Sequence, residues 1–278
     1  MQIGVTIHAT DQTLAPAELA REAEGRGFHS LYLPEHTHIP VSRRTPPPTG
    51  EAELGEEYKR SLDPWVALAT AAALTSRIRL GTGVALVAQH HPIALAKQIA
   101  TLDRLSAGRF VLGIGYGWNA EEMENHGIDV RRRRARVRET LLAMQELWSK
   151  EVASFQGEFV RFEPSWQWPK PVQQPRPPVL IGGAPGPTLF AHVAEYADGW
   201  MPIGGAGLRR ALPGLRKALE ERGRDPDEIR VVPFGVRPDP GKLDYYASIG
   251  VSEAVLRLPC AGRDPVLRAL DEFARFVP

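Results

Sequence analysis

Short apolar segments alternate with longer amphipathic ones along the chain, and this alternation constrains the fold more than any other feature. Eight segments rich in apolar and β-branched residues are predicted strands: 2–7, 30–33, 78–84, 110–113, 179–181, 199–202, 230–234 and 253–257. Each precedes a predicted helix: 16–25, 64–73, 92–105, 131–148, 188–196, 208–222, 242–248 and 264–276. Such a series forms a parallel sheet, either open and doubly wound or closed into a barrel, and eight units favour a closed (β/α)8 TIM barrel.

Three connections are too long for simple turns. Residues 37–62, with the proline-rich run 45–50, follow the second strand, and residues 115–130 follow the fourth. Both are expected at the carboxyl ends of strands, where a barrel carries its active site. The third, 150–178, follows the fourth helix and is predicted to contain a small hairpin at 155–162 and then an extended segment with Trp166 and Trp168. Without a linker or internal repeat, the sequence predicts one domain over residues 1–278, with insertions after strands two and four and after helix four.

Composition excludes several classes of protein. The 34 basic and 33 acidic residues leave a formal charge of +1, which does not suit a nucleic-acid partner. Cys260 is the only cysteine, so a disulfide framework and a zinc site of several thiolates are excluded, and a reducing cytoplasm is favoured. No apolar run is long enough for a membrane span, and neither export nor a membrane partner is expected.

Ionisable side chains directly follow the second predicted strand. Glu35, His36 and His38 lie where a barrel places catalytic groups, and a histidine can exchange a proton near neutral pH. His36 is the strongest candidate and His38 a weaker one; the alternative for each is a histidine packed under a loop. The His-x-His spacing would also suit a metal pair, but no other histidines follow at successive strand ends, so no metal site is expected.

Glycine-rich segments follow three other strands. Gly81 and Gly83 predict a bulge or a close backbone approach, or simply a strand that needs small residues to fit its neighbours. The G-x-G-x-G spacing of 113–117 is not that of a Rossmann site, and the segment 113–119 is predicted to be a ledge for a flat ring. The small residues of 181–188 expose backbone N–H groups at the start of a helix, which predicts a phosphate-binding site. The alternative is a tight turn between a strand and a helix.

Two conspicuous features are given no leading role. The arginines of 131–138 fan around a helix, so a solvated surface with ion pairs is predicted, from which one arginine could reach an anionic ligand. Cys260 follows the eighth strand, but no basic neighbour in the sequence would activate it as a nucleophile.

Taken together, five blocks resemble the bacterial luciferase-like monooxygenase superfamily, and within it the branch of oxidoreductases that use the deazaflavin F420. The blocks are 33–40, 80–84, 101–110, 113–122 and 178–184, in the order of the family and spread over nearly the whole chain. The resemblance implies a barrel that binds F420 or FMN at its carboxyl end, with hydride transfer at C5 or N5 of the ring.

The resemblance also implies roles for individual residues. His36 matches the position that faces the cofactor ring, and Glu35 its acidic neighbour; both are carried over as catalytic. The cofactor-binding set implied is His36, Gly83, Val84, Tyr116, Gly117, Trp118, Asn119, Gly182, Gly183 and Ala184. In that set, Gly83–Val84 matches a non-prolyl cis peptide behind the ring, and 182–184 match the phosphate-binding turn.

One departure from the family bears on the substrate. Sugar-phosphate dehydrogenases of the family have a glutamate proton donor where this chain has Trp118, and Glu121 and Glu122 are out of register with it. The departure favours a reductase, or an oxidoreductase with an apolar substrate, in a pocket lined by Trp118 and Trp200.

The leading hypothesis is an enzyme that exchanges hydride between F420 and an organic small molecule. The second is an FMN-dependent monooxygenase that receives reduced flavin from a separate reductase and uses O2. The third is a cofactor-binding protein without turnover. The family also implies a homodimer, for which the tryptophan-rich segment after the fourth helix offers an amphipathic surface.

Overall fold

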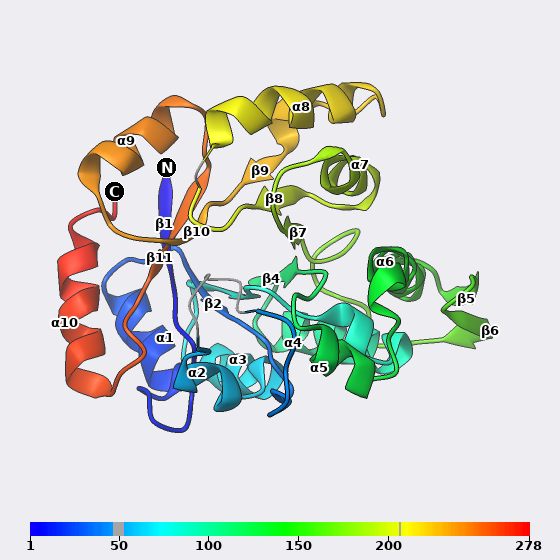
Figure 1. Ribbon diagram of the computed structural model, residues 1–278, viewed down its shortest axis with the longest axis horizontal. Coiled ribbons are helices and arrows are strands. Elements are labelled where there is room, and N and C mark those ends of the chain that lie inside the picture. The colour runs from blue at the N-terminus through cyan, green and yellow to red at the C-terminus, as the bar shows by residue number, and fades with distance from the viewer. Residues whose placement is uncertain (47–52, 206) are drawn as a thin grey trace.

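The computed structural model describes residues 1–46, 53–205 and 207–278, in which strands and helices alternate as the sequence predicts (Figure 1). The parallel strands are β1 (Gln2–Thr6), β2 (Ser30–Leu33), β3 (Arg79–Thr82), β4 (Phe110–Ile114), β7 (Val179–Gly182), β8 (Gly199–Met201), β9 (Arg230–Val231), β10 (Phe234–Val236) and β11 (Glu253–Arg257). Of the proline-rich run predicted after the second strand, residues 47–50 lie outside the described residues.

These strands form one sheet that curls back on itself. Their order is β10-β11-β1-β2-β3-β4-β7-β8-β9, and its two end strands, β9 and β10, are consecutive in the chain. Between them, the N–H of Val232 donates to the Trp200 carbonyl at 2.9 Å, and the Pro233 carbonyl accepts from Val255 N–H at 2.9 Å. The prediction of one strand over 230–234 was therefore wrong, because the structure has two short strands there, β9 and β10. Because Pro233 has no N–H to donate to a neighbouring strand, the pairing with β8 is interrupted between β9 and β10.

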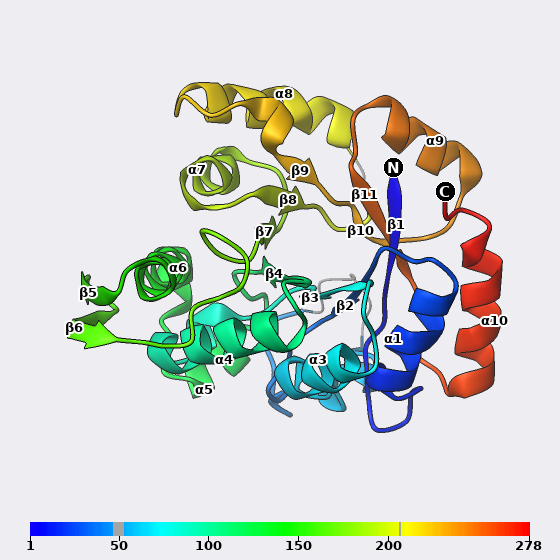
Figure 2. The same ribbon diagram turned by 180° about the vertical axis from the view of Figure 1, so that it is seen from behind.

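The main helices surround the strands in both views (Figures 1 and 2). They are α1 (Pro16–Gly25), α3 (Pro64–Ala73), α4 (Pro92–Leu105), α6 (Arg133–Ser149), α7 (Pro187–Tyr196), α8 (Leu208–Glu220), α9 (Pro240–Ser248) and α10 (Arg263–Ala274). Several begin with a proline, whose missing N–H would have no helical partner there in any case. Asp63 caps α3, because its Oδ1 accepts the Val66 N–H at 2.9 Å.

Two layers of apolar side chains hold this arrangement together. The larger layer fills the space between helices and sheet. A smaller cluster is drawn from six different strands or strand ends, and it consists of Tyr32, Val111, Leu180, Met201, Val232 and Val255. Val84 and Phe234 pack against this inner cluster and are themselves only partly buried. Val84 and Phe234 therefore border the inner cluster on the side where the strands have their carboxyl ends.

The longer connections add short elements that the sequence did not predict. Between β2 and α3 lies α2 (Glu56–Lys59), and between β4 and α6 lie α5 (Ala120–Asn125) and the 3-10 turn η2 (Val130–Arg132). After α6, β5 (Val152–Gln156) and β6 (Arg161–Trp166) pair as an antiparallel hairpin that projects beside α6 (Figure 1). The hairpin was predicted, but β6 reaches Trp166, which had been assigned to the extended segment.

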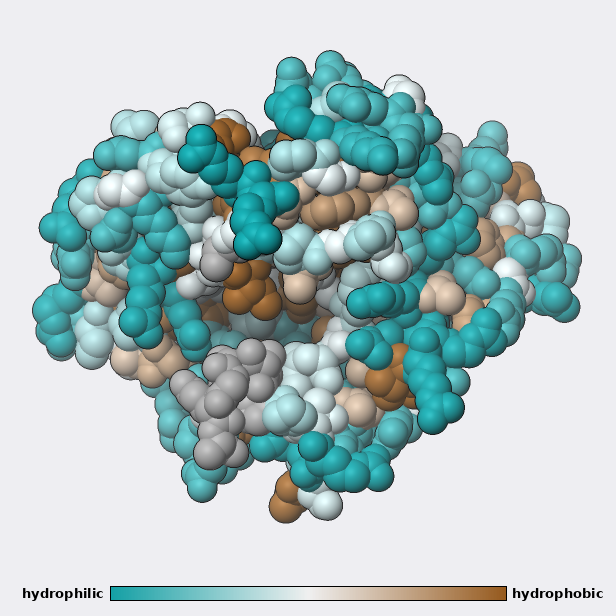
Figure 3. All heavy atoms as spheres, turned by 45° about the horizontal axis from the view of Figure 1, so that its top comes forward, coloured by the Kyte–Doolittle hydropathy of each residue, from teal (hydrophilic) through white to brown (hydrophobic). Residues whose placement is uncertain are grey.

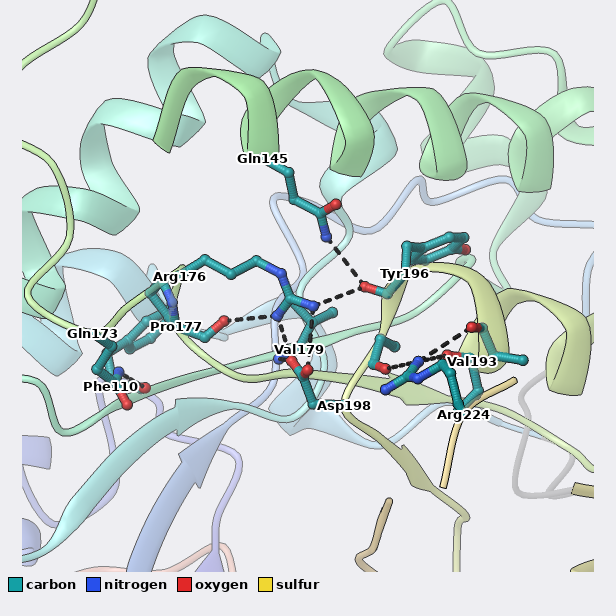
Figure 4. A network of polar contacts seen from close by, with 12 residues as sticks. Phe110, Gln145, Gln173, Arg176, Pro177, Val179, Val193, Tyr196, Asp198 and Arg224 are labelled. Carbon is teal, nitrogen blue, oxygen red and sulfur yellow. Dashed lines mark hydrogen bonds and ion pairs between the residues drawn. The ribbon is translucent and has the colours of Figure 1, made fainter. Parts of the chain in front are cut away.

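At the start of β7, polar groups join the sheet to its helices (Figure 4). Arg176 donates to both Asp198 oxygens, and the same carboxylate accepts the Val179 N–H at 2.7 Å. Gln145 of α6 and Arg176 both donate to the Tyr196 carbonyl at the end of α7. This end of the sheet is thus closed by internal hydrogen bonds, whereas the carboxyl end carries the cavity described below. Among the described residues, no helix combines the length and apolar character needed to cross a bilayer.

Candidate functional site

A cavity of about 260 Å³ lies where the carboxyl ends of several strands meet. Its lining residues come from the ends of β1, β2, β3, β8, β10 and β11, with two more from the segments after β2 and β4: Thr6, Ile7, His8, Pro34, Glu35, His36, Tyr58, Gly83, Val84, Leu86, Trp118, Ile203, Phe234, Gly235 and Arg257. The face drawn in Figure 3 is hollowed near its centre and bordered by hydrophobic and hydrophilic residues. Because parallel strands end on the same side of a barrel-like sheet, residues distant in sequence converge there.

The Gly83–Val84 peptide bond forms part of the cavity wall, and it is cis, as the resemblance to the family implies. A Cβ on Gly83 would lie 2.4 Å from the Phe234 ring, so only glycine fits at this point. A Cβ on Gly182 would lie 2.8 Å from a Val84 methyl group. Val84 thus lies between the cavity and the predicted phosphate-binding turn, and connects the two.

His36 forms a pair that the sequence did not predict. Its Nδ1 lies 2.8 Å from Oε2 of Glu122, which belongs to α5, and both side chains are buried. The second oxygen of Glu122 accepts the Thr37 N–H at 3.2 Å. The rings of Tyr58 and Trp118 lie at 5.4 and 5.8 Å from the imidazole. His36 is therefore fixed by a carboxylate on one side and aromatic rings on others, while it lines the cavity.

Glu35 also lines the cavity, but its carboxylate is held by protein donors. Oε1 accepts from Trp65 Nε1–H at 2.9 Å and lies 2.8 Å from His90 Nε2, and Oε2 accepts the Leu86 N–H at 2.6 Å. Burial works to lower the pKa of His90, but its hydrogen bond to Glu35 and the charges of Glu35 and Asp63 raise the pKa above its usual value. Glu35 therefore ties the segment after β2 to the segment that carries Gly83–Val84.

Besides Thr6, three polar cavity residues with a ring or a charge were missed by sequence reasoning: His8, Tyr58 and Arg257. The His8 ring lies 4.7 Å from Tyr58, and burial lowers the pKa of His8 to about 4, with the charges of His36 and Arg257 acting in the same direction. Arg257 approaches Glu57 only at 3.8 Å, through a side chain that is about half exposed. A signal was available for two of them, because His8 follows β1 and Arg257 ends β11, both at carboxyl ends of strands.

The apolar wall of the cavity also differs from the prediction. Trp118, Ile203, Phe234 and Val84 line it, but Trp200 does not. Trp200 is buried, packs edge-on against Phe190 and donates its Nε1–H to the Gly183 carbonyl at 2.9 Å. The prediction that Trp200 lines the pocket was wrong; the ring instead supports the turn after β7.

That turn, 182–184, leads into α7 through Pro185 and Gly186. Gly183 has a φ of +151°, which a side chain would strain, and no side chain caps the start of α7. Gly182, Gly183 and Ala184 do not line the cavity itself, but Gly182 packs on Val84, which does. Free backbone N–H groups at this turn suit an anion, and the assignment to phosphate stays a prediction.

The segment after β4 divides between the cavity and its surroundings. Trp118 lines the cavity, whereas the Tyr116 hydroxyl lies 2.7 Å from Nδ1 of His192. Gly117 has a φ of +81° and lets the chain turn toward α5. Asn119 is buried, and neither polar atom of its side chain has a partner among the described residues. An unpartnered buried amide of this kind would be satisfied by a polar ligand group.

The remaining candidates lie away from the cavity. His38 is half-buried and lies 3.0 Å from the Thr37 hydroxyl and 2.9 Å from Asn125. Burial raises the pKa of the Cys260 thiol, the reverse of what a nucleophile needs. Among the arginines of 131–138, Arg132 pairs with Glu158 and Arg138 pairs with Glu195. These ion pairs confirm the predicted ion-paired helix surface. Arg134 instead lies over the Tyr116 ring, 5.5 Å from its centre.

A planar redox cofactor with an anionic tail fits these residues. The cavity offers an apolar wall at Val84 and Phe234 for a flat ring, and the turn after Gly182 offers backbone donors for an anion. The unpartnered Asn119 amide lies on the segment that follows β4, near the same end of the sheet. Among the described residues, no group of three or more His, Cys, Asp or Glu side chains could hold a metal ion.

Comparisons with known proteins agree with this geometry. A Mycobacterium tuberculosis protein of uncharacterized function is 45% identical over 277 residues, covering 99% of this chain and 98% of that one. The F420-dependent glucose-6-phosphate dehydrogenase of Kineococcus radiotolerans is 32% identical over 238 residues, covering 80% of this chain and 64% of the relative. This match therefore spans slightly less than two thirds of the dehydrogenase.

Among solved structures, an F420-dependent secondary alcohol dehydrogenase in complex with an F420-acetone adduct superposes with a TM-score of 0.78 at 18% identity, covering 100% of this chain and 98% of that one. At this identity the likeness establishes the fold, a parallel sheet curled as in TIM barrels. Residues 2–237 match the family model described as luciferase-like monooxygenase. The chain belongs to the luciferase-like monooxygenase family.

Proposed function

We propose that this protein is an oxidoreductase that exchanges a hydride between coenzyme F420 and an organic small molecule. The observation that carries the proposal is one cavity that combines His36 and Trp118 with the Gly83–Val84 wall at the carboxyl end of the sheet. The F420-dependent relative and structural neighbour support the choice of cofactor. The fold we propose is the closed (β/α)8 barrel of a single domain, with insertions after strands two and four and after helix four.

In this proposal the protein positions reactants and handles a proton, because the cofactor supplies the redox chemistry: when bound, the deazaflavin accepts or donates hydride at C5. Val84 and Phe234 support the ring, and Gly182, Gly183 and Ala184 hold the phosphate. Tyr116, Gly117, Trp118 and Asn119 accompany the ring and its side chain. His36 exchanges the substrate proton at Nε2, and Glu35 keeps the cavity wall in place through its three donors.

The cavity also suggests a class of substrate. Trp118 stands where sugar-phosphate dehydrogenases of the family carry a glutamate, and Ile203 and Phe234 add apolar surface. Arg257 also lines the cavity, but a carboxylate oxygen of Glu57 lies 3.8 Å from its guanidinium group and partly balances its charge. We therefore propose a ketone or secondary alcohol with an apolar body as substrate rather than a sugar phosphate. Glucose 6-phosphate is the control compound that should not react.

Titration of the purified protein with F420 and with FMN, each followed by fluorescence quenching, tests the choice of cofactor. We expect saturable quenching of F420 at one cofactor per chain and binding of FMN that is at least roughly tenfold weaker, a difference of about 1.4 kcal/mol. Tighter binding of FMN would favour the FMN-dependent monooxygenase, which needs a separate reductase. If neither cofactor binds, the proposal fails.

A variant of the turn after β7 tests the proposed phosphate-binding site separately. Gly183→Val forces a side chain onto a φ of +151° and places its Cβ 3.3 Å from Leu189, with no atom of Val84 within 4 Å, and so distorts the turn. We expect weaker binding of F420 but unchanged binding of a deazaflavin that lacks the phosphate. Equal losses for both ligands would show that the variant disturbs the ring site instead. We also propose a homodimer formed through the tryptophan-rich segment after α6, which gel filtration with light scattering would test.

A further inference from the structure

Glu122 is a buried carboxylate to which the resemblance assigns no role. It lies on α5, 86 positions along the chain from His36, and only 1% of its side chain is exposed. Its Oε2 is 2.8 Å from His36 Nδ1, and its Oε1 accepts the Thr37 N–H at 3.2 Å. The carboxylate therefore contacts two consecutive residues of the segment after β2, one through the side chain and one through the backbone.

These contacts decide which ring nitrogen carries the proton. An ionised carboxylate only accepts hydrogen bonds, so the nitrogen that faces it must donate. In a neutral imidazole the other nitrogen then has the lone pair. Nε2 of His36 has no hydrogen-bond partner among the described residues, and His36 lines the cavity.

We propose that Glu122 is a positioning residue that fixes His36 in the tautomer with the proton on Nδ1, so that Nε2 offers its lone pair to the substrate. In the oxidation of a secondary alcohol, the O–H bond breaks and Nε2 receives the proton. The hydride on the carbon that carries this hydroxyl group would pass to C5 of F420, and the C=O bond forms. In reduction, the imidazolium returns the proton to the carbonyl oxygen. In both directions Glu122 stabilises the positive charge of the ring.

Thr37 makes the inference sharper, because it sets the orientation of a replacement side chain. In Glu122→Gln the amide oxygen is needed by the Thr37 N–H, so the NH2 group faces His36 Nδ1. Nδ1 must then accept, and the proton moves to Nε2. The substitution is nearly isosteric but reverses the tautomer, which removes the proton acceptor from the cavity.

The assignment of the tautomer stands independently, whereas its catalytic consequence rests on the proposed function. The first test is therefore a 15N NMR spectrum of the histidine rings at a pH where imidazoles are neutral, with His36 assigned by its loss in His36→Gln. We expect a protonated Nδ1 and an unprotonated Nε2 in the wild-type protein. A proton on Nε2 in the wild type would overturn the inference without any enzymatic assay.

The second test uses Glu122→Gln with Glu121→Gln as its matched control. Glu121 is also buried on α5, but it accepts the Arg44 backbone N–H at 2.7 Å and does not contact His36. We expect Glu122→Gln to reverse the tautomer and to lower kcat about 10²- to 10⁴-fold with little change in KM. Glu121→Gln should leave the tautomer as in the wild type. A wild-type tautomer in Glu122→Gln contradicts the inference, whereas the expected tautomer without F420 turnover contradicts the proposed function alone.

Discussion

Two histidine–carboxylate pairs with buried carboxylates lie at the same end of the sheet, and they differ in what surrounds them. His36 and Glu122 approach to 2.8 Å, and so do His90 and Glu35. Glu35 accepts from two further donors of the protein, whereas Glu122 accepts from one, the Thr37 N–H. His36 lines the candidate cavity and His90 does not. The distance between the partners therefore does not distinguish the pair that we propose to be reactive from the one that we propose to be structural, whereas access to the second ring nitrogen of the histidine does.

The largest expected effect is on the pair that reaches the cavity. His36→Ala removes the proton acceptor, so turnover should fall about 10²- to 10⁴-fold, while affinity for F420 changes little. Steady-state kinetics and fluorescence titration measure the two quantities. The control is His38→Ala, since His38 is only half-buried and does not line the cavity. Unchanged hydride exchange in His36→Ala would mean that access of the ring to the cavity does not make the His36 pair reactive. If the variant instead keeps its affinity for F420 and loses turnover, a binding protein without enzymatic activity is excluded.

The second prediction concerns the structural pair. Glu35→Ala leaves Trp65 Nε1–H, the Leu86 N–H and His90 without their acceptor. Because these groups are buried or partly buried, the free energy of unfolding should fall by about 3 kcal/mol, measured by urea denaturation. Glu158→Ala breaks an exposed ion pair with Arg132 and should leave the midpoint unchanged. If the free energy of unfolding falls no more in Glu35→Ala than in Glu158→Ala, Glu35 does not have the proposed structural role.

The overall alternation could be predicted because its causes are local. Proline at the first turn of α1, α3 and α4, and the Asp63 cap, fix helix starts within a few residues. The start of β2 and the end of β11 follow from apolar runs between polar neighbours. The break at Pro233 was also local in cause, since a proline inside a predicted strand removes a ladder hydrogen bond.

The contacts of the site could not be predicted in the same way. The pairing of Glu122 with His36 depends on where α5 begins and how it turns, and neither is encoded next to either residue. The burial that lowers the pKa of His8 comes from Tyr58 and other residues far along the chain. The positions of His8 and Arg257 at strand ends were visible in the sequence, but their convergence requires the curled sheet. The cis Gly83–Val84 bond was predicted only through resemblance to the family.

The third prediction uses His8, a cavity histidine for which no carboxylate partner is found among the described residues. Its pKa is lowered to about 4 by burial and by the charges of His36 and Arg257. Between about pH 6.5 and pH 4 the unfolded chain therefore binds the proton that the folded one excludes, and the free energy of unfolding falls as the pH falls. The full effect is about 3 kcal/mol.

His8→Gln should remove this dependence. The difference in unfolding free energy between pH 7 and pH 4.5, measured by urea denaturation, should be smaller in the variant than in the wild type. An equal difference in both proteins would show that His8 is not held neutral, and the contrast between paired and unpaired histidines would no longer hold.

The smallest expected effect has the opposite sign and comes from His90. Although burial works to lower its pKa, the bond to Glu35 and the charges of Glu35 and Asp63 raise it. The stabilisation that this raised pKa provides is complete below the pKa of an unfolded histidine and is lost as the pH rises through the folded value. The advantage of the wild type over His90→Gln in unfolding free energy should therefore be larger at about pH 5.5 than at about pH 8.5. Asp63→Asn keeps an acceptor for the Val66 N–H but removes one negative charge, so the loss should be complete at a lower pH in that variant. If the advantage instead grew with pH, the surroundings of His90 would lower its pKa rather than raise it, and the effect assigned to Glu35 and Asp63 would be wrong.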